Sequence, residues 1–311
     1  MMICNRGTCL EKDNELLSKF KSLGWGDSQQ SQSIFNLLVQ ARNQVQPDDV
    51  ILDLGAGECR YRFFFDKCNY VSVDFGKGDK NWDFGSNDII GDITKLDFIK
   101  SESVPYVLNT TVLEHINEPS ELLSHIHRIL RPGGKLFLYV PFVQFEHQIP
   151  FDFYRYTSYG LRYLCEKSGL EVVELAPSNA PLETSLTFVL HSVETIRTDS
   201  LAKRTFLRSL RLSMRFSLFL ISRLWKEGVS REVVDWGFPI CWTLVARKPG
   251  IENPSKADRI APTDRKKIIE SIVKCPKCKS DTIDLLYEDS HYICPKCGER
   301  FRTHDQQIIF G

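Results

Sequence analysis

The chain has 311 residues, and its 40 basic and 40 acidic side chains give a formal net charge of zero. This balance excludes a global electrostatic attraction to nucleic acid. With 42% hydrophobic and 11% aromatic residues the chain can bury a substantial core, which excludes disorder as its overall state. The length predicts one large domain or two domains of unequal size.

Targeting signals are not evident in the sequence. The N-terminal residues contain no charged segment followed by an apolar stretch, and no apolar run reaches the roughly 18 residues of a membrane span. Of the ten cysteines, four have the spacing of metal ligands and six are scattered. This usage favours a reducing, cytosolic compartment over a disulfide-bonded secreted protein.

Residues 1–47 are predicted to form an N-terminal helical cap. Leu16, Leu17, Phe20 and Leu23 recur at helical spacing, and Asp27 with Gln30 resembles a capping box for a second helix. This segment could form a lid over a pocket or could simply pack on the edge of a sheet.

Residues 48–250 alternate between strand and helix patterns, which predicts an α/β, Rossmann-like, doubly wound parallel sheet. The expected strands are residues 50–54, 70–74, 89–90, 107–109 and 135–141, with a helix over 121–130 and Arg-Pro-Gly-Gly after it. A helix over 159–168 and strands at 171–175 and 241–247 follow. Ligands of such sheets bind outside the carboxyl ends of the strands.

A glycine-rich turn follows the first strand of this sheet. In VILDLGAGECR the strand ends in Asp53, and Gly55 and Gly57 allow the backbone to approach a ligand closely. The second strand ends in Asp74, where a carboxylate can hold two vicinal hydroxyl groups. The pair predicts a binding site for an adenine nucleoside.

Several motifs in this order resemble the class I S-adenosylmethionine-dependent methyltransferases of type 11. LDLGAGECR is similar to their first motif, VDF to their second, and LNTTVLEHINEP with RILRPGGKLFLYVP to the fourth and fifth strands. The resemblance covers about residues 34–250. It implies a seven-stranded sheet that ends in a hairpin, S-adenosylmethionine as cofactor, and these cofactor-binding residues: Asp53, Gly55, Gly57, Asp74, Asp92, which would hold the adenine, and Asn109.

The sequence departs from that family at two places. Cys59 replaces the usual third glycine, and Asn109-Thr110-Thr111 stands where N-methyltransferases acting on amides or bases carry a Pro-Pro motif. The rival interpretation of the turn, an NAD-dependent dehydrogenase, requires a glycine where Arg60 stands, which disfavours it.

Two histidines are candidate catalytic bases for methylation of a hydroxyl group, because histidine titrates near neutral pH. His115 lies in VLEHI and could equally orient the pocket wall. His147 lies beyond the fifth strand with Asp152 and Arg155, in a stretch that resembles a subset of methyltransferases associated with sugar or polysaccharide modification. Asp152 and Arg155 are candidate acceptor contacts, or alternatively a local ion pair that fixes the loop.

An insertion at about residues 177–239 contains a basic amphipathic helix over residues 201–226. An apolar face that includes Leu207, Met214 and Trp225 lies beside a stripe formed by Arg204, Arg208, Arg211 and Arg215. Such a helix predicts peripheral membrane contact, a partner surface or a clamp on an anionic substrate. The alternative is that the apolar face packs on its own domain.

The C-terminal part consists of a polar linker at residues 251–264 and a small domain at residues 265–311. Two CxxC pairs, Cys275 with Cys278 and Cys294 with Cys297, predict a closed, structural Zn²⁺ site. Residues 265–311 resemble a small zinc-ribbon family, some members of which are activator subunits of RNA- and protein-modifying methyltransferases. The ribbon could dock on the catalytic domain or help to bind the acceptor.

Three functions follow from the sequence. The first is O-methylation of a hydroxyl group on a sugar, a glycan or another small molecule, in the cytoplasm or at a membrane surface. The second is methylation of RNA or protein, although the zero net charge disfavours a nucleic-acid partner. The third is a non-catalytic cofactor-binding protein.

Overall fold

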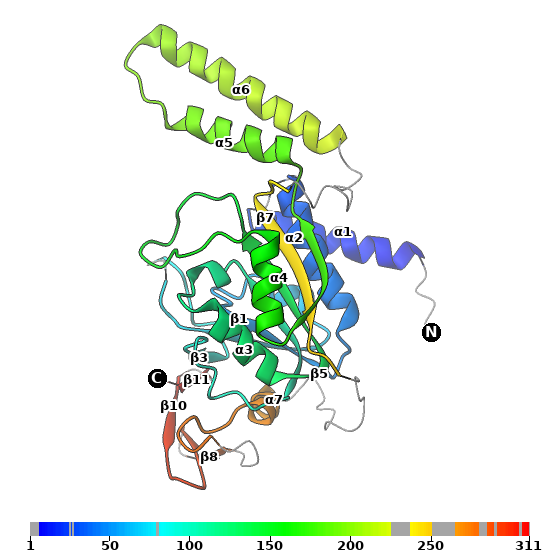
Figure 1. Cartoon of the computed structure of the whole chain (residues 1–311), viewed down its shortest axis with the longest axis vertical. Helices are drawn as coiled ribbons and strands as arrows, with labels where there is room; N and C mark the ends of the chain where they lie inside the picture. The colour runs from blue at the N-terminus through cyan, green and yellow to red at the C-terminus, as the bar shows by residue number, and fades with distance from the viewer. Residues whose placement is uncertain are drawn as a thin grey trace.

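The protein is built around one large mixed β-sheet (Figure 1). The computed structural model describes residues 6–24, 26, 28–78, 81–224, 237–250, 265–279, 285–288, 291–304 and 307–310. The predicted linker at residues 251–264 lies outside the described residues, as do Asp27 and Trp225. No helix of the described part is long and apolar enough to cross a membrane.

Five parallel strands form the centre of the sheet in the order β3-β2-β1-β4-β5. Every residue of β1, β2 and β4 is buried, as expected for strands covered on both faces. The α/β, Rossmann-like prediction is confirmed. The five strands are β1 (Val50–Leu54), β2 (Asn69–Asp74), β3 (Ile89–Gly91), β4 (Val104–Thr110) and β5 (Leu130–Pro141).

The sheet continues beyond β5 with a pair of antiparallel strands. β7 (Cys241–Arg247) pairs antiparallel with both β5 and β6 (Glu171–Pro177), so β6 forms the edge. Because β6 runs in the same direction as β5, its carboxyl end lies at the same edge of the sheet as those of β1 to β5.

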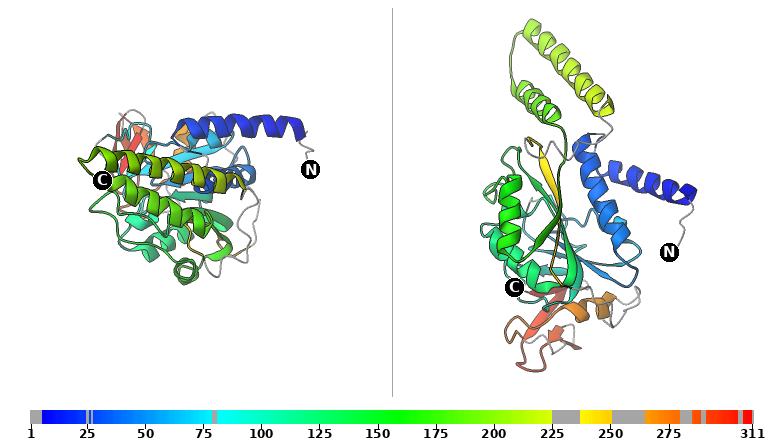
Figure 2. Two further views of the ribbon diagram at one scale, coloured as in Figure 1. Left: turned by 90° about the horizontal axis from the view of Figure 1, so that it is seen from above. Right: turned by 45° about the vertical axis from the view of Figure 1, so that its right-hand side comes forward.

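α2 (Gln29–Gln44) covers one face of the sheet, and α1 (Arg6–Ser22) extends away from it with only its C-terminal part packed on the core (Figure 2). The two helices form, with the short helix η1 (Arg62–Phe65), a core that includes Ile34, Leu38 and Phe64. The sequence predicted Asp27 as the N-cap of α2, which was wrong. The N-cap is Ser28, whose side chain accepts a hydrogen bond from the Ser31 N–H at 3.1 Å.

The opposite face carries α3 (Pro119–Ile129) and α4 (Ser158–Lys167) (Figure 2). The apolar residues predicted for α3 are buried, among them Leu122, Leu123 and Ile126. The chain returns to the sheet at once after α3, because β5 already begins at Leu130 and includes the Arg-Pro-Gly-Gly segment.

The insertion between β6 and β7 forms a helical hairpin that projects from the sheet (Figures 1 and 2). Its first helix, α5 (Pro181–Thr195), was not predicted, whereas α6 (Leu201–Leu224) agrees with the expected helix as far as the described residues reach. Since the hairpin follows β6, it begins at the carboxyl edge of the sheet.

The C-terminal module, residues 265–310, adds four strands to the sheet. Its last strand, β11 (Gln307–Phe310), pairs parallel with β3, so the sheet has eleven strands and not the seven expected. The other elements of the module are α7 (Arg265–Ile272), β8 (Leu286–Glu288), β9 (His291–Ile293) and β10 (Arg300–His304).

Contacts between side chains also join the module to the sheet. The ring of Phe310 stacks on Phe98 with centroids 4.8 Å apart, and Arg265 forms an ion pair with the buried Asp88. Residues of α7 belong to the same buried cluster as β1 and β2. Of the two roles left open for this part of the chain, docking is therefore observed.

Candidate active site and metal centre

The glycine turn after β1 has the close packing expected of a ligand-binding turn. Gly55 has φ +79°, and a Cβ atom there would lie 2.5 Å from the side chain of Val112. Gly57 has φ +54°, and its N–H donates to Asp74 Oδ2 at 2.9 Å. The turn and the acid of β2 are therefore held together, as the sequence predicted.

Cys59 preserves the backbone conformation that a glycine would adopt at this position. Its φ is +55°, in the left-handed region that glycine enters at no steric cost. The thiol is buried and lies 3.5 Å from Asn87 Oδ1. Cys59 therefore holds a backbone conformation that glycine would also adopt.

Asp53 and Asn109 bring buried polar atoms to the carboxyl ends of β1 and β4. Tyr70 donates its hydroxyl hydrogen to Asp53 Oδ2 at 2.5 Å, and Asn109 Nδ2 donates to the Leu54 carbonyl at 2.9 Å. The second oxygen of each side chain, Oδ1, has no hydrogen-bond partner among the described residues. Burial raises the pKa of Asp53 to about 7.

Asp74 and Asp92 follow the neighbouring strands β2 and β3 at the same edge. Asp74 Oδ1 accepts the Gly76 N–H at 2.9 Å, and Asp92 accepts the Thr94 hydroxyl at 2.6 Å. These acceptor groups fit S-adenosylmethionine, because carboxylates can accept hydrogen bonds from the ribose hydroxyls, from the adenine amino group and from the ammonium group of the methionine part. We expect Asp74 to bind the ribose and Asp92 the adenine.

A second cluster lies beyond β4 and β5 and contains both predicted histidines. The Glu114 carboxylate is fully buried, with Oε1 at 3.8 Å from His115 Nε2 and 3.7 Å from His147 Nε2. The two imidazole rings are in edge-to-face contact at a centroid distance of 4.8 Å. The structure therefore brings His115 and His147 into one site.

Backbone contacts fix the turn that carries Glu114 and His115. The turn is the short helix η2 (Leu113–His115). Its Glu114 carbonyl accepts a hydrogen bond from the Phe153 N–H at 2.9 Å, and its Leu113 carbonyl accepts one from the Tyr156 hydroxyl at 2.8 Å. The loop that carries His147 thus holds the turn from the other side.

Asp152 and Arg155 form a bidentate ion pair with N···O distances of 2.6 and 2.7 Å. The guanidinium group lowers the pKa of Asp152 to about 2. Asp152 also accepts the His147 backbone N–H at 2.9 Å, and the Glu114 carboxylate raises the pKa of His147. The pair fixes the loop, and its contact with an acceptor stays a prediction.

Two features of this site were not found from the sequence. Glu114 was visible next to His115, but adjacent residues on a strand or helix point in different directions, and only the tight turn η2 directs both inward. The other feature is α5, whose Phe188 and His191 contact the ring of Phe145 at centroid distances of 4.5 and 4.3 Å.

The four cysteines of the two CxxC pairs converge in the C-terminal module. Their sulfur atoms lie within 4.8 Å of one another, with Sγ···Sγ distances of 3.6 Å for Cys275–Cys297 and 3.5 Å for Cys278–Cys294. Tetrahedral Zn²⁺ with Zn–S bonds of about 2.3 Å separates sulfur ligands by about 3.8 Å. The cluster therefore fits a structural zinc ion with no open position.

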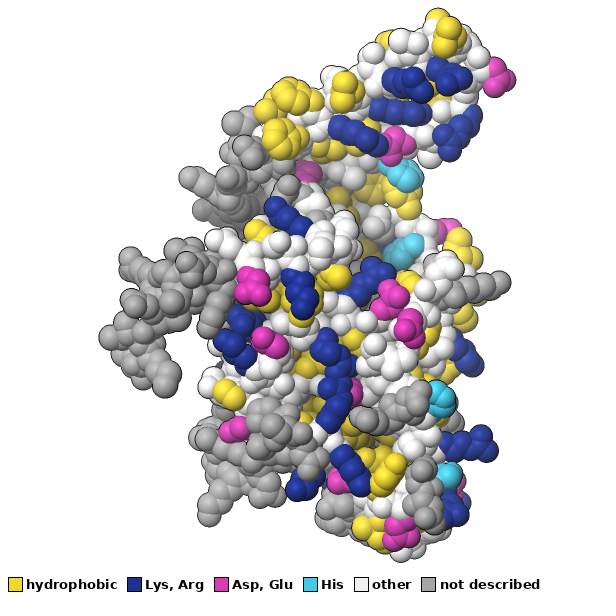
Figure 3. Space-filling model, turned by 180° about the vertical axis from the view of Figure 1, so that it is seen from behind, with side chains coloured by type: hydrophobic (Ala, Val, Ile, Leu, Met, Phe, Trp, Pro, Cys, Tyr) yellow, Lys and Arg dark blue, Asp and Glu magenta, His cyan; other side chains and the backbone are white. Residues whose placement is uncertain are grey.

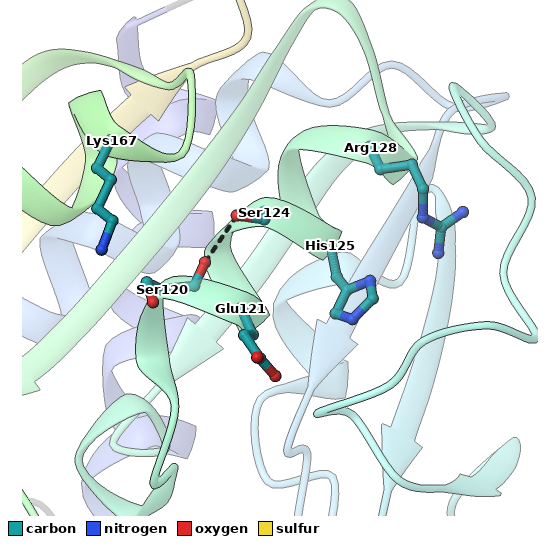
Figure 4. Close-up of a pocket in the computed structure, with 6 residues that line it drawn as sticks. All are labelled: Ser120, Glu121, Ser124, His125, Arg128 and Lys167. Atoms are coloured by element: carbon teal, nitrogen blue, oxygen red, sulfur yellow. Dashed lines mark hydrogen bonds between the residues drawn. The ribbon is translucent and has the colours of Figure 1, made fainter.

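A further pocket lies along α3 (Figure 4). Residues of α3 line it together with Lys167 at the end of α4. Arg128 donates there to the carbonyls of Leu96 and Ile99 at 2.7 and 2.9 Å, so its role is structural.

Comparison with known families identifies the central part of the chain. Residues 52–138, from β1 into β5, match the model of a methyltransferase domain. This segment contains the glycine turn, Asp74, Asp92 and the Glu114–His115 turn. The protein is an enzyme, and its class is that of the S-adenosylmethionine-dependent methyltransferases.

Solved structures resemble the chain at low identity. A chain from a complex with the Haloferax volcanii Trm112 methyltransferase activator has 19% identity and a TM-score of 0.45, covering 71% of this chain and 90% of its own. The Burkholderia thailandensis 1,6-didemethyltoxoflavin-N1-methyltransferase has 14% identity and a TM-score of 0.42, with coverages of 80% and 92%. No curated protein matches the sequence.

Proposed function

We propose that the enzyme methylates a hydroxyl group on a sugar, a glycan or another small molecule. Bound S-adenosylmethionine, held by the glycine turn, Asp74 and Asp92, would supply the methyl group and would leave as S-adenosylhomocysteine once the acceptor oxygen has taken it. The hydroxyl proton must leave during this step, so the site needs a group that promotes its loss.

The observation that carries the proposal is the Glu114–His115–His147 cluster at the carboxyl edge. Two imidazoles and a buried carboxylate meet beyond β4 and β5, at the edge where the glycine turn and Asp74 lie. Of the three, His147 is the most accessible, with 34% of its side chain exposed. It is therefore the candidate base, and His115 orients the site.

The loop around His147 presents aromatic surface to an acceptor. Four aromatic side chains of this loop are at least 40% exposed, although large aromatic rings are usually buried: Phe145, Phe151, Phe153 and Tyr154. Binding sites for small molecules typically combine aromatic walls with a few polar groups. This combination supports a glycan or a similar ring-containing acceptor.

A tritium methyl-transfer screen tests the acceptor class. Sugars, glycans and lipid-linked sugars form one arm, and RNA and protein fractions form the other. We expect label in the first arm and a decrease of at least about 10²-fold for His147→Ala, with unchanged cofactor binding. Label confined to RNA or protein would contradict the proposal.

We also propose that α6 contacts an anionic membrane surface. The face predicted to be apolar, with Leu207, Leu210 and Met214, packs partly against α5, as the alternative expected. A second apolar face stays exposed, however. It includes Leu201, Phe206, Leu212, Phe216, Phe219 and Leu220, each at least 39% exposed.

Basic side chains flank this second apolar face. Arg204, Arg208 and Arg215 are exposed on α6, and Figure 3 shows basic and hydrophobic side chains gathered on the projecting hairpin. Adjacent apolar and basic surfaces favour binding to the anionic, cytoplasmic face of a membrane. The hairpin rises from the carboxyl edge, so it would place the active site near a membrane-bound acceptor.

Sedimentation with vesicles tests the membrane contact. We expect the enzyme to pellet with anionic vesicles at low salt, and both Phe216→Ser and Arg208→Glu to reduce the pelleted fraction. Tyr163→Ser, on α4, is the matched control, because it removes an exposed aromatic ring outside the hairpin. A wild-type enzyme that stays in the supernatant would exclude this role.

We also propose that the chain has four parts. A helical cap at residues 1–47 and a methyltransferase domain at residues 48–250 precede the linker at residues 251–264 and a zinc ribbon at residues 265–311. The Cys4 cluster and the docked module support the assignment of the ribbon as a stabilising part of the same chain.

A further inference from the structure

The Glu114–His115–His147 cluster presents acceptor atoms to one another without a donor between them. Both oxygens of Glu114 and Nε2 of His115 have no hydrogen-bond partner in the part of the chain that is described. His147 Nε2 faces the same carboxylate at 3.7 Å, beyond hydrogen-bond distance. A buried carboxylate in this position requires a compensating cation.

The remaining ring nitrogens fix the tautomer of both histidines. His115 Nδ1 lies 2.7 Å from the Phe151 carbonyl, and His147 Nδ1 lies 3.0 Å from the Phe145 carbonyl. A carbonyl oxygen only accepts, so each Nδ1 carries the hydrogen. Each neutral imidazole then directs the lone pair of Nε2 toward Glu114, which is the arrangement typical of metal-ligating histidines.

Arg155 forms no hydrogen bond with Glu114 among the described residues. All five N–H donors of Arg155 are used, two on Asp152 and three on the carbonyls of Gln144, Phe145 and Tyr154. The Tyr156 hydroxyl donates to the Leu113 carbonyl at 2.8 Å. The charge of Glu114 is therefore compensated either by protonation of His147, which the carboxylate favours, or by a bound cation at the same place.

We propose that Glu114, His115 and His147 bind a divalent first-row transition-metal ion. Two imidazoles and a carboxylate suit Mn²⁺, Fe²⁺, Co²⁺ or Zn²⁺ better than the oxygen-bound Mg²⁺ and Ca²⁺. Bonds of about 2.1 Å place neighbouring ligand atoms about 3.0–3.4 Å apart. The two distances to Glu114, 3.7 and 3.8 Å, need to shorten by a few tenths of an ångström, and all three ligand atoms lie within 4.8 Å of one another.

A metal ion at this place would also take part in the methylation, and this role rests on the proposed function. Three protein ligands would leave coordination positions open, and the 34% exposure of the His147 side chain makes the site accessible to an acceptor. An acceptor hydroxyl bound there would lose its proton to solvent more readily, because the ion stabilises the alkoxide. His147 is then a ligand, and the metal ion replaces the base.

The test is a titration of the full chain with MnCl₂, followed by calorimetry and by electron paramagnetic resonance. Zinc is retained at the four cysteines throughout. Mn²⁺ disfavours thiolates and so avoids the cysteine cluster. We expect one Mn²⁺ per chain, with binding at least about 10-fold weaker in Glu114→Gln and His147→Gln. His125→Gln, on α3, should bind as the wild type does.

The outcomes separate this inference from the proposed function. Thermal unfolding and cofactor affinity of each variant show whether it is folded. No Mn²⁺ uptake by the folded wild type at millimolar concentration, or equal uptake by the Glu114→Gln variant, would overturn the metal site. If hydroxyl acceptors are then still methylated, the proposed function stands with His147 as base. If Mn²⁺ binds but no hydroxyl acceptor is methylated, the metal site stands and the proposed function is contradicted.

Discussion

At the scale of single residues, Cys59 shows how a departure from a motif is accommodated. A non-glycine residue in the left-handed region costs about 1–2 kcal/mol, and the buried thiol offsets part of this cost. We expect Cys59→Gly to change the free energy of unfolding by no more than about 1 kcal/mol and to bind cofactor normally. Cys59→Val should destabilise by more, because β-branched residues fit this conformation poorly.

Denaturant titration of the two Cys59 variants, with cofactor affinity by calorimetry, measures these effects. A valine variant as stable as the wild type would show that the left-handed conformation is not required. A glycine variant with strongly weakened cofactor binding would show that the thiol has a direct role.

Glu183 predicts a pH-dependent stability. It is buried at the start of α5, and burial raises its pKa to about 7. Among the described residues its carboxylate accepts one hydrogen bond, from the Gln29 N–H to Oε1 at 3.1 Å. The folded state therefore binds a proton that the unfolded state releases above about pH 4.5, so the contribution of Glu183 to stability falls between pH 4.5 and 7.

Glu183→Gln removes this dependence. Between pH 5 and pH 7.5 the unfolding temperature of the wild type should fall relative to that of the variant. Asp53 has the same sign of shift but is present in both proteins, so it cancels in the difference. A difference that stays constant with pH would contradict the raised pKa.

At the scale of elements, the pairing of β11 with β3 depends on Phe310. Its ring is buried and contacts Phe98 and Phe301 at centroid distances of 4.8 and 5.0 Å. We expect Phe310→Ala to lower the free energy of unfolding by about 3 kcal/mol or more. Tyr163→Ala removes an exposed ring from α4 and should change it by less than about 0.5 kcal/mol. Similar losses in both variants would argue against the docked arrangement.

The sequence was informative where the pattern is local. β1 and β7 have the predicted bounds, because each is a short apolar run whose ends are marked by a proline, a glycine or a charged side chain. α5 was missed because its polar and apolar residues alternate irregularly, and the β3–β11 pairing was missed because it joins segments about 220 residues apart.

The glycine turn and the convergence of the four cysteines were predictable because glycine turns and CxxC pairs are local patterns, whereas the roles of these residues as cofactor and zinc ligands stay predictions. The role of Glu114 was not predictable, since it depends on the direction of one turn and on a loop more than thirty residues away, whose carbonyls hold the histidines.

At the scale of the whole molecule, the zinc centre and the cofactor site belong to one sheet. β11 pairs with Gly91, the residue before the adenine-binding candidate Asp92. Removal of zinc by a chelator should therefore lower the unfolding temperature by roughly 10 °C and weaken cofactor binding. Readdition of zinc should restore both, and unchanged cofactor affinity in the zinc-free protein would show that the two sites are independent.

The position of β11 also has a consequence for synthesis of the protein. β3 is translated early, but its outer edge is paired only by a strand about 220 residues later in the chain. At about 5–20 residues per second this edge stays open on the ribosome for roughly 10–40 s. An unpaired edge strand can template aggregation, so we expect nascent chains stalled before residue 307 to require chaperone protection.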